Sequence, residues 1–223
     1  MPAMSTPRII VFSRTTGYRH DSIPDGIAAL RDLGGAHGFG VTATEDPAEF
    51  AAALPGCRLA VFLSTSGTVL DEAGREALRA HQAAGGGFVG VHAAAATEYD
   101  WPWYGELIGA RFDRHPELQP GTVRVEDRGH PATVHLGDSW RLTDEWYDFE
   151  SNPRDTVRVL ARADGSSYRD GRMGADHPLV WCHENTGGRS FYTALGHTSE
   201  CYTDPVFRAH LAGGLLWAAG HPG

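Results

Sequence analysis

Three histidines follow strand-type runs in this sequence, each close to the point where the run ends. His20 comes after the apolar run at 8–13, His92 directly after the run at 88–91, and His197 just beyond the run at 190–195. The carboxyl ends of parallel strands lie along one edge of a sheet, so we expect the three side chains to converge on one crevice. A histidine can give or take a proton near neutral pH because its unperturbed pKa is about 6.5. The three together predict a site for general acid–base chemistry.

The segment around His92 is the most informative one. The apolar run Gly87-Phe-Val-Gly-Val91 passes without a linker into His92 and four alanines. A strand that turns at once into a helix forms an elbow, which presents one side chain at the edge of an α/β sheet. Hydrolases usually carry a serine or cysteine nucleophile there. Because this chain carries a histidine, we expect an active site without that nucleophile, with His92 pointing out of the core into the crevice.

Further residues could complete this site. Glu145 and Tyr147 are two apart, which on an extended segment would place a carboxylate and a phenol on the same side, although an exposed acidic loop is the alternative. Clustered aromatic side chains are commonly core residues, but next to the elbow they would also suit the C–H face of a pyranose ring. In His115-Pro116 the proline holds the histidine in extended geometry. The candidate substrate-binding residues are Tyr18, Trp101, Trp103, Tyr104, His115 and Tyr147.

A metal ion is an alternative use of the same residues. His20, His92, His197 and Glu145 are enough ligands for zinc or manganese. The sequence contains no His-x-His or His-Glu-x-x-His pair that would favour a metal site. We therefore expect no cofactor, with a divalent metal such as zinc as the alternative.

The elements that must position these residues alternate between strand and helix. Strands are predicted at 8–13, 39–44, 59–64 and 88–91, with helices at 22–33, 47–54 and 71–84 between them. This spacing predicts an α/β fold with a doubly wound, mostly parallel sheet and helices on both faces. Residues 101–147 are rich in aromatic side chains, and we expect them to form an insertion at the carboxyl edge, which would be either a lid over the site or an interface. Strands at 157–161, 179–183 and 190–195 and a helix at 204–219 complete one domain over 8–220, after a disordered lead-in at 1–7.

Composition excludes several classes of protein. The 223 residues are 41% hydrophobic, enough for a full core. A net charge of −9 argues against a nucleic-acid or membrane surface, and no apolar run approaches the roughly 20 residues of a membrane span. With no signal peptide and three scattered cysteines suited to reduced thiols, we expect a cytoplasmic protein. The chain has no lysine, which excludes catalysis through a lysine Schiff base. The sequence does not decide between a monomer and a homo-oligomer.

The chain resembles the ThuA-like family, the trehalose-utilisation proteins, over about 8–220. The resemblance rests on motifs in order: Gly17-Tyr-Arg-His-Asp-Ser-Ile23, Gly90-Val-His92, Trp103-Tyr104, Leu107-Ile-Gly-Ala-Arg-Phe112, His115-Pro116, His130-Pro131, Asp144-Glu145 with Tyr147, Gly188-Arg-Ser-Phe-Tyr-Thr-Ala-Leu-Gly-His197 and Leu215-Leu-Trp-Ala218. It implies a flavodoxin-like fold similar to that of class I glutamine amidotransferases. Their elbow is Gly-x-Cys-x-Gly, whereas this chain has Gly90-Val-His-Ala-Ala94 and lacks the thiol, so we expect no glutaminase activity.

The resemblance also implies a role with trehalose or a related disaccharide, including 3-keto forms, and a sugar dehydrogenase as a pathway partner. We predict a sugar-directed hydrolase, lyase or isomerase in which His20, His92, His197 and Glu145 transfer protons to a small-molecule sugar. One alternative is a non-catalytic sugar-binding or complex-forming subunit on a degenerate amidotransferase scaffold. The other is a metal-dependent sugar enzyme with histidine ligands.

Overall fold

A single nine-stranded sheet organises the computed structural model, which describes residues 6–220. Most of the lead-in predicted at 1–7 lies outside the described residues. Five strands form the parallel part in the order β2-β1-β3-β4-β11: β1 (Arg8–Phe12), β2 (Gly40–Thr44), β3 (Leu59–Leu63), β4 (Gly87–Val91) and β11 (Ser190–Thr193). The sheet continues as an antiparallel part in the order β10-β9-β6-β7: β10 (Pro178–His183), β9 (Arg158–Ala163), β6 (Gln119–Val125) and β7 (Ser139–Asp144).

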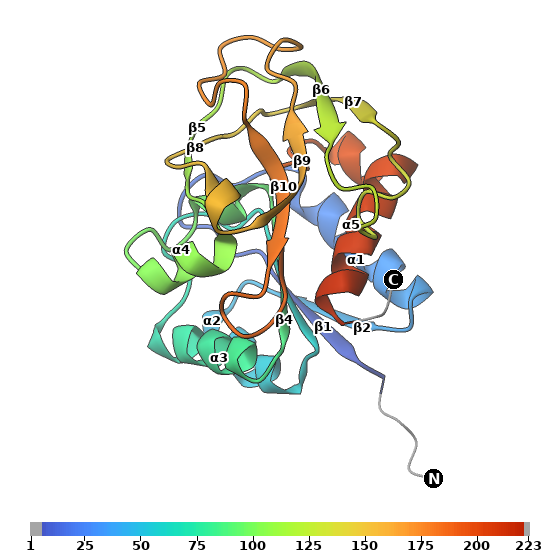
Figure 1. Cartoon of the computed structure of the whole chain (residues 1–223). Helices are drawn as coiled ribbons and strands as arrows, with labels where there is room; N and C mark the ends of the chain where they lie inside the picture. Colours follow the sequence, from blue (N-terminus) through green and yellow to red (C-terminus); the bar gives the residue numbers. More distant parts are fainter. Residues whose placement is uncertain (1–5, 221–223) are drawn as a thin grey trace.

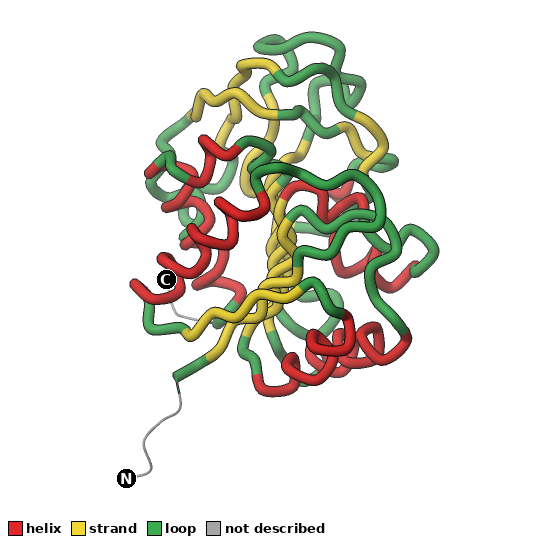
Figure 2. Tube along the Cα trace, turned by 180° about the vertical axis from the view of Figure 1, so that it is seen from behind, coloured by secondary structure: helices red, strands yellow, loops and turns green. Residues whose placement is uncertain are grey.

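Helices cover both faces of the parallel part, which confirms the predicted α/β fold (Figures 1 and 2). The helices α1 (Ile23–Ala36) and α5 (Pro205–Ala218) pack together on one side, and α2 (Pro47–Ala53), α3 (Glu72–Ala83) and α4 (Pro102–Ile108) lie on the other. Asp46, Asp71 and Asp204 cap α2, α3 and α5, each accepting a hydrogen bond from a backbone N–H of the first turn.

The helix α1 ends at Ala36, three residues later than the sequence predicts. The Gly34-Gly35 pair that follows the predicted end does not break it. A Cβ at Gly34 would lie 2.2 Å from Cγ2 of Val41, so this glycine lets the helix approach β2 closely.

The central strands of the sheet are fully buried. Every residue of β3 and β4 is buried, as expected of parallel strands covered on both faces. The registers place Val91, at the end of β4, beside Leu63 on one side and Thr193 on the other. The carboxyl ends of three strands are thereby aligned beneath one edge of the sheet.

The insertion predicted at 101–147 adds two strands to the main sheet, β6 and β7. It contributes α4, β6 and β7, together with β5 (Phe112–Arg114), which pairs with β8 (Asp148–Phe149). The antiparallel direction of β10 relative to β11 follows from the connection at 184–189, which is too short for a parallel crossover.

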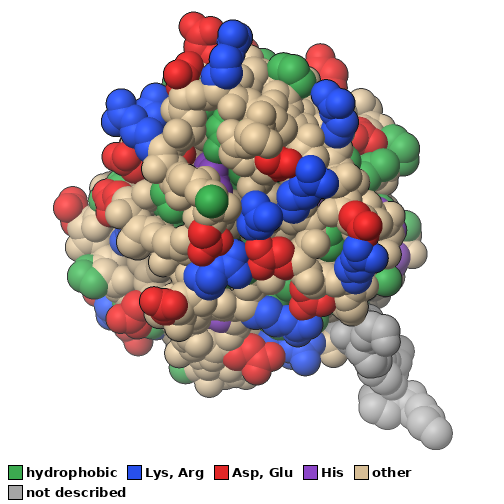
Figure 3. Space-filling model, turned by 45° about the horizontal axis from the view of Figure 1, so that its top comes forward, with side chains coloured by type: hydrophobic (Ala, Val, Ile, Leu, Met, Phe, Trp, Pro, Cys, Tyr) green, Lys and Arg blue, Asp and Glu red, His purple; other side chains and the backbone are tan. Residues whose placement is uncertain are grey.

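Charged side chains are interspersed over the face seen in Figure 3, consistent with a chain that carries 19 arginines and 28 acidic residues. Within residues 6–220, the structure contains no helix with the length and apolar character of a membrane span.

Candidate active site

The four residues predicted to transfer protons lie together at the carboxyl edge of the parallel strands. His20 lies in the loop between β1 and α1, His92 starts the 3-10 helix η2 (His92–Ala96), Glu145 follows β7, and His197 follows β11. One nitrogen or carboxylate oxygen from each lies within 4.8 Å of the corresponding atoms of the other three. We call these four side chains the His₃Glu cluster.

The elbow at His92 is present but points into the protein. His92 has a φ of 52°, in the left-handed region that a non-glycine residue seldom occupies. A Cβ at Gly90 would lie 2.5 Å from Cδ1 of Ile108, so only glycine allows this close packing under the elbow. The His92 side chain is 0% exposed, which corrects the expectation that it points out of the core. The ring instead forms the base of the His₃Glu cluster.

Nε2 of His92 is the most crowded atom of this cluster. It lies 3.1 Å from Nε2 of His20, 3.3 Å from Nδ1 of His197 and 3.3 Å from Oε2 of Glu145. The hydroxyl of Tyr147 lies 2.9 Å from the same nitrogen. On the other side of the ring, Nδ1 lies 2.7 Å from the carbonyl oxygen of Ala194. Because a carbonyl only accepts hydrogen bonds, Nδ1 must carry a proton.

Asp144 holds two of the loops in place. Its buried carboxylate accepts hydrogen bonds from the backbone N–H groups of Glu145 at 2.8 Å, Gly196 at 2.8 Å and His197 at 3.1 Å. One side chain therefore ties the loop after β7 to the loop after β11. Sequence reasoning did not assign this positioning role, although Asp144 belongs to the motif around Glu145.

Glu145 and His197 form an ion pair, with Nδ1 of His197 3.0 Å from Oε2 of Glu145. Burial alone would raise the pKa of Glu145, but hydrogen bonds from His197 and His92 outweigh it and hold that pKa well below its usual range. Burial also opposes protonation of His197, yet its hydrogen bond to Glu145 raises its pKa above the ordinary value. Burial, with the neighbouring His92 and His197, lowers the pKa of His20 to about 3. The cluster thus combines an ionised carboxylate, a basic histidine and a neutral one.

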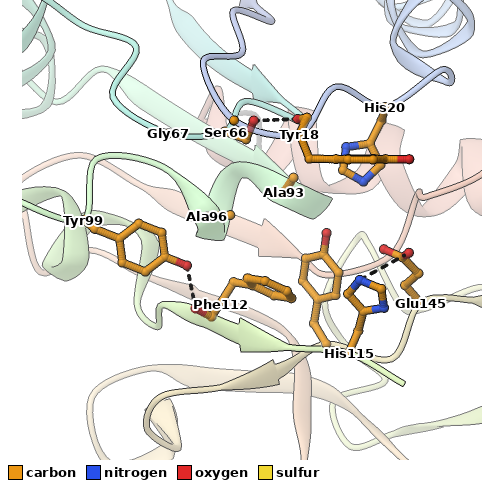
Figure 4. Close-up of a pocket in the computed structure, with 12 residues that line it drawn as sticks. Tyr18, His20, Ser66, Gly67, Ala93, Ala96, Tyr99, Phe112, His115 and Glu145 are labelled. Carbon is orange, nitrogen blue, oxygen red and sulfur yellow. Dashed lines mark hydrogen bonds and ion pairs between the residues drawn. The ribbon is translucent and has the colours of Figure 1, made fainter. Parts of the chain in front are cut away.

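A cavity of about 540 Å³ opens above the cluster (Figure 4). His20 and Glu145 line it, whereas His92 and His197 are not among its lining residues. Glu145 Oε1 lies 3.5 Å from Nε2 of His115 on the cavity wall. The remaining lining residues are Gly17, Tyr18, Ser66, Gly67, Ala93, Ala96, Tyr99, Phe112 and Tyr147. The cavity has aromatic walls and a polar floor, the general form of a small-molecule site.

Three of the aromatic candidates lie away from this cavity, in contrast to the expectation from the sequence. Trp101 is 5% exposed and stacks on Trp103 with ring centroids 4.9 Å apart. The guanidinium of Arg79 lies over both rings. Tyr104 is fully buried and its hydroxyl donates to the carbonyl of Ala94. Tyr104 thus contacts η2 through Ala94, while Trp101 and Trp103 pack on each other and on Arg79, so core packing and not sugar contact accounts for these rings.

Sequence reasoning missed Tyr99 and Phe112, whose side chains stand on the opposite wall from Tyr18 in Figure 4. The Tyr99 hydroxyl donates to the carbonyl of Phe112. Phe112 ends one of the motifs in the sequence, which was the available signal for it.

The arrangement can move protons or hold a cation, but it offers no activated thiol. Burial raises the pKa values of Cys182 and Cys201 to about 12, so both thiols stay protonated. Among residues 6–220, the group of side chains that could hold a metal ion is the His₃Glu cluster.

Comparisons with known proteins agree with the resemblance seen in the sequence. The model of the ThuA family, described as trehalose utilisation, matches residues 8–218. A ThuA-like protein from Bacteroides uniformis superimposes with a TM-score of 0.82 at 24% identity, over 98% of this chain and 95% of that one. A ThuA-like protein from Parabacteroides merdae gives a TM-score of 0.80 at 20% identity, over 96% and 90%. A β-galactosidase from Bacillus circulans gives 0.62 at 14% identity, over 97% of this chain and 31% of that one. No curated protein matches the sequence significantly.

Proposed function

This chain belongs to the ThuA family of trehalose utilisation, and from that premise we propose that it is an enzyme acting on trehalose or a related disaccharide. The reaction takes place in the cavity above the His₃Glu cluster and proceeds by proton transfer. The ThuA-like structural neighbours share the fold at low identity, so the chemistry is argued from the cavity itself.

The observation that carries the proposal is the placement of Glu145. Its carboxylate lies on the cavity floor with Oε2 on His197 and Oε1 facing His115. One carboxylate therefore connects a buried histidine cluster to the wall of the cavity. Such a chain of ionisable groups allows a proton to be taken from one position of a substrate and returned at another.

The walls favour a neutral sugar. The rings of Tyr18, Tyr99 and Phe112 offer flat apolar faces, and the polar groups of the floor can pair with hydroxyls. Among the described residues that line the cavity, none is an arginine, and the chain has no lysine. A phosphorylated sugar would lack a cationic partner here, so the chemistry supports an unphosphorylated disaccharide.

A 3-keto disaccharide suits this set of groups best, because its carbonyl acidifies the neighbouring C–H bond and no covalent nucleophile is needed. Glu145 removes the proton from the carbon between the carbonyl and the glycosidic carbon. The released electron pair forms a carbon–carbon double bond, and the glycosidic C–O bond breaks with its electrons on the departing oxygen. A histidine in contact with Glu145, His197 or His115, protonates that oxygen. The products are an unsaturated keto sugar and a free sugar.

Turnover of trehalose and of 3-keto-trehalose by the purified chain tests the proposal, with products followed by mass spectrometry. Glu145→Gln keeps the shape of the side chain but cannot take the proton, so we expect the rate to fall by about 100-fold or more. Glu117→Gln, an exposed glutamate outside the cavity, is the matched control and should keep the wild-type rate.

A non-catalytic sugar-binding subunit is the second candidate, favoured by the buried histidine at the elbow position. It predicts that calorimetric titration detects sugar binding while neither sugar is turned over by the wild type. That result would contradict the enzymatic proposal. Equal rates for wild type and Glu145→Gln would contradict the role assigned to Glu145.

A further inference from the structure

We propose that His20, His92, His197 and Glu145 bind a divalent ion of a first-row transition metal on the floor of the cavity. The inference rests on the proposed function, because the ion would act on the sugar in the same cavity.

The spacing of the four donor atoms is the first argument. A tetrahedral ion with bonds of about 2.0–2.2 Å to nitrogen and oxygen separates its ligand atoms by about 3.3–3.6 Å. In the cluster, Nε2 of His92 lies 3.1 Å from the His20 nitrogen, 3.3 Å from the His197 nitrogen and 3.3 Å from the Glu145 oxygen. The Glu145 oxygen lies 3.0 Å from the His197 nitrogen. These four separations are within a few tenths of an ångström of the edges around a bound ion, and the two remaining pairs, both of which involve His20, lie within 4.8 Å, so the His20 ring has the largest adjustment to make when an ion binds.

The second argument is that hydrogen bonds cannot account for these contacts. Because Nδ1 of His92 donates to Ala194, the neutral ring has a single lone pair on Nε2, and the protonated ring would have a single hydrogen there. Neither form can satisfy two imidazole nitrogens, a carboxylate oxygen and the Tyr147 hydroxyl, all within 3.3 Å. A cation at the centre would satisfy all three imidazole lone pairs and one carboxylate oxygen together.

The supporting contacts are those of a preorganised metal site. A metal-binding histidine commonly donates its other N–H to a carbonyl, as Nδ1 of His92 does to Ala194 at 2.7 Å. Asp144 fixes the backbone of Glu145 and His197 through three N–H groups, so two ligands are held by hydrogen bonds to a buried carboxylate.

The donor set selects the type of ion. Three imidazoles and one carboxylate suit zinc, manganese, iron, cobalt or nickel, whereas calcium and magnesium prefer oxygen ligands. His20 and Glu145 line the cavity, so a sugar carbonyl can approach the ion from that side. The ion would polarise the carbonyl and acidify the neighbouring C–H bond. Coordination through Oε2 leaves Oε1 of Glu145, together with His115, for proton transfer.

The test uses the untagged full chain, freed of metal with a chelator and dialysed. Titration with cobalt(II), followed by its visible absorption, should show one tight site per chain, and zinc(II) should displace the cobalt. We expect His197→Ala and Glu145→Gln to weaken cobalt(II) binding by about 100-fold or more, because each removes a direct ligand of the ion. Loss of a residue that only orients a ligand already weakens metal binding by about 10–100-fold. His135→Ala, which removes an exposed histidine outside the cluster, should bind as wild type does.

A wild-type chain without a tight cobalt(II) or zinc(II) site would overturn the inference, as would equal loss of binding in His135→Ala. Metal-free protein that turns over 3-keto-trehalose at the wild-type rate would overturn the role of the ion in the reaction, and would leave the proposed function standing. Tight binding of one ion without turnover of either sugar would support the metal site and contradict the proposed function.

Discussion

Replacing Asp144 tests whether this residue holds the loops of the candidate site. Oδ1 accepts the backbone N–H groups of Glu145 and His197, and Oδ2 accepts that of Gly196. Asp144→Asn keeps one oxygen and puts an NH₂ group in place of the other. In either orientation of the amide, at least one buried N–H then faces a donor and loses its partner.

An unsatisfied buried donor destabilises a protein by about 1–3 kcal/mol, so we expect Asp144→Asn to lower the free energy of unfolding by that amount. Asp144→Ala leaves three N–H groups without an acceptor, and its effect should be larger, about 3–5 kcal/mol. Urea unfolding followed by circular dichroism measures both. Asp155→Asn, at an exposed position, is the control and should stay within about 0.5 kcal/mol of wild type.

The variant should also affect the cluster, because the loops that carry Glu145 and His197 lose their common anchor. We expect the affinity for cobalt(II) to fall by about 10-fold or more in Asp144→Asn, as for other residues that orient metal ligands. If Asp144→Asn unfolds at the wild-type urea concentration and binds cobalt(II) as wild type does, the positioning role of Asp144 is refuted.

Three further outcomes are expected. His92→Ala should lower the free energy of unfolding by about 2–3 kcal/mol, because it leaves the Ala194 carbonyl without its donor and opens a cavity in the protein. Urea unfolding measures this loss. A loss below about 1 kcal/mol, as expected of a side chain that points into a crevice, would contradict the buried geometry. Burial lowers the pKa of His210 from 6.5 to about 4, so between these values the unfolded chain binds a proton that the folded chain excludes. Stability should therefore fall as the pH drops from about 6.5 toward 4, by up to about 3 kcal/mol from this residue, and the slope should flatten in His210→Gln. Glutamine should not be hydrolysed, as ammonia release would show, because the elbow carries an imidazole where a thiolate would be needed.

The parallel half of the fold could be predicted because its strands are short apolar runs bounded by polar or glycine-rich segments. The run at 88–91 is such a case, and β4 is buried at every residue from Gly87 to Val91. The antiparallel half carries a weaker signal. In β7, buried Trp140 alternates with exposed Ser139 and Arg141, and this strand was not predicted. Its place beside β6 depends on pairing across the sheet, which a local pattern does not contain.

The candidate site could be predicted in part for a similar physical reason. Carboxyl ends of parallel strands share one edge, so His20, His92 and His197 could be expected to meet. The pattern could not tell that the ring of His92 turns inward, because that depends on its left-handed φ. Nor could it distinguish the buried ring of Trp101 from the exposed one of Tyr99, since the two aromatic residues are only two positions apart in the chain.

The His₃Glu cluster draws its members from four segments that are far apart along the chain: His20 and His92 are 72 positions apart, and His92 and His197 are 105 positions apart. No early fragment of a growing chain contains the cluster, so the site can form only after the final parallel strand has been synthesised and inserted. Pairings of such long sequence separation also form late in folding, because the connecting segments must first be ordered. A ligand that contacts all four segments would stabilise the native state as a whole, by about 2.7 kcal/mol at a hundred times its dissociation constant. Its binding would then slow amide hydrogen exchange in all four segments together.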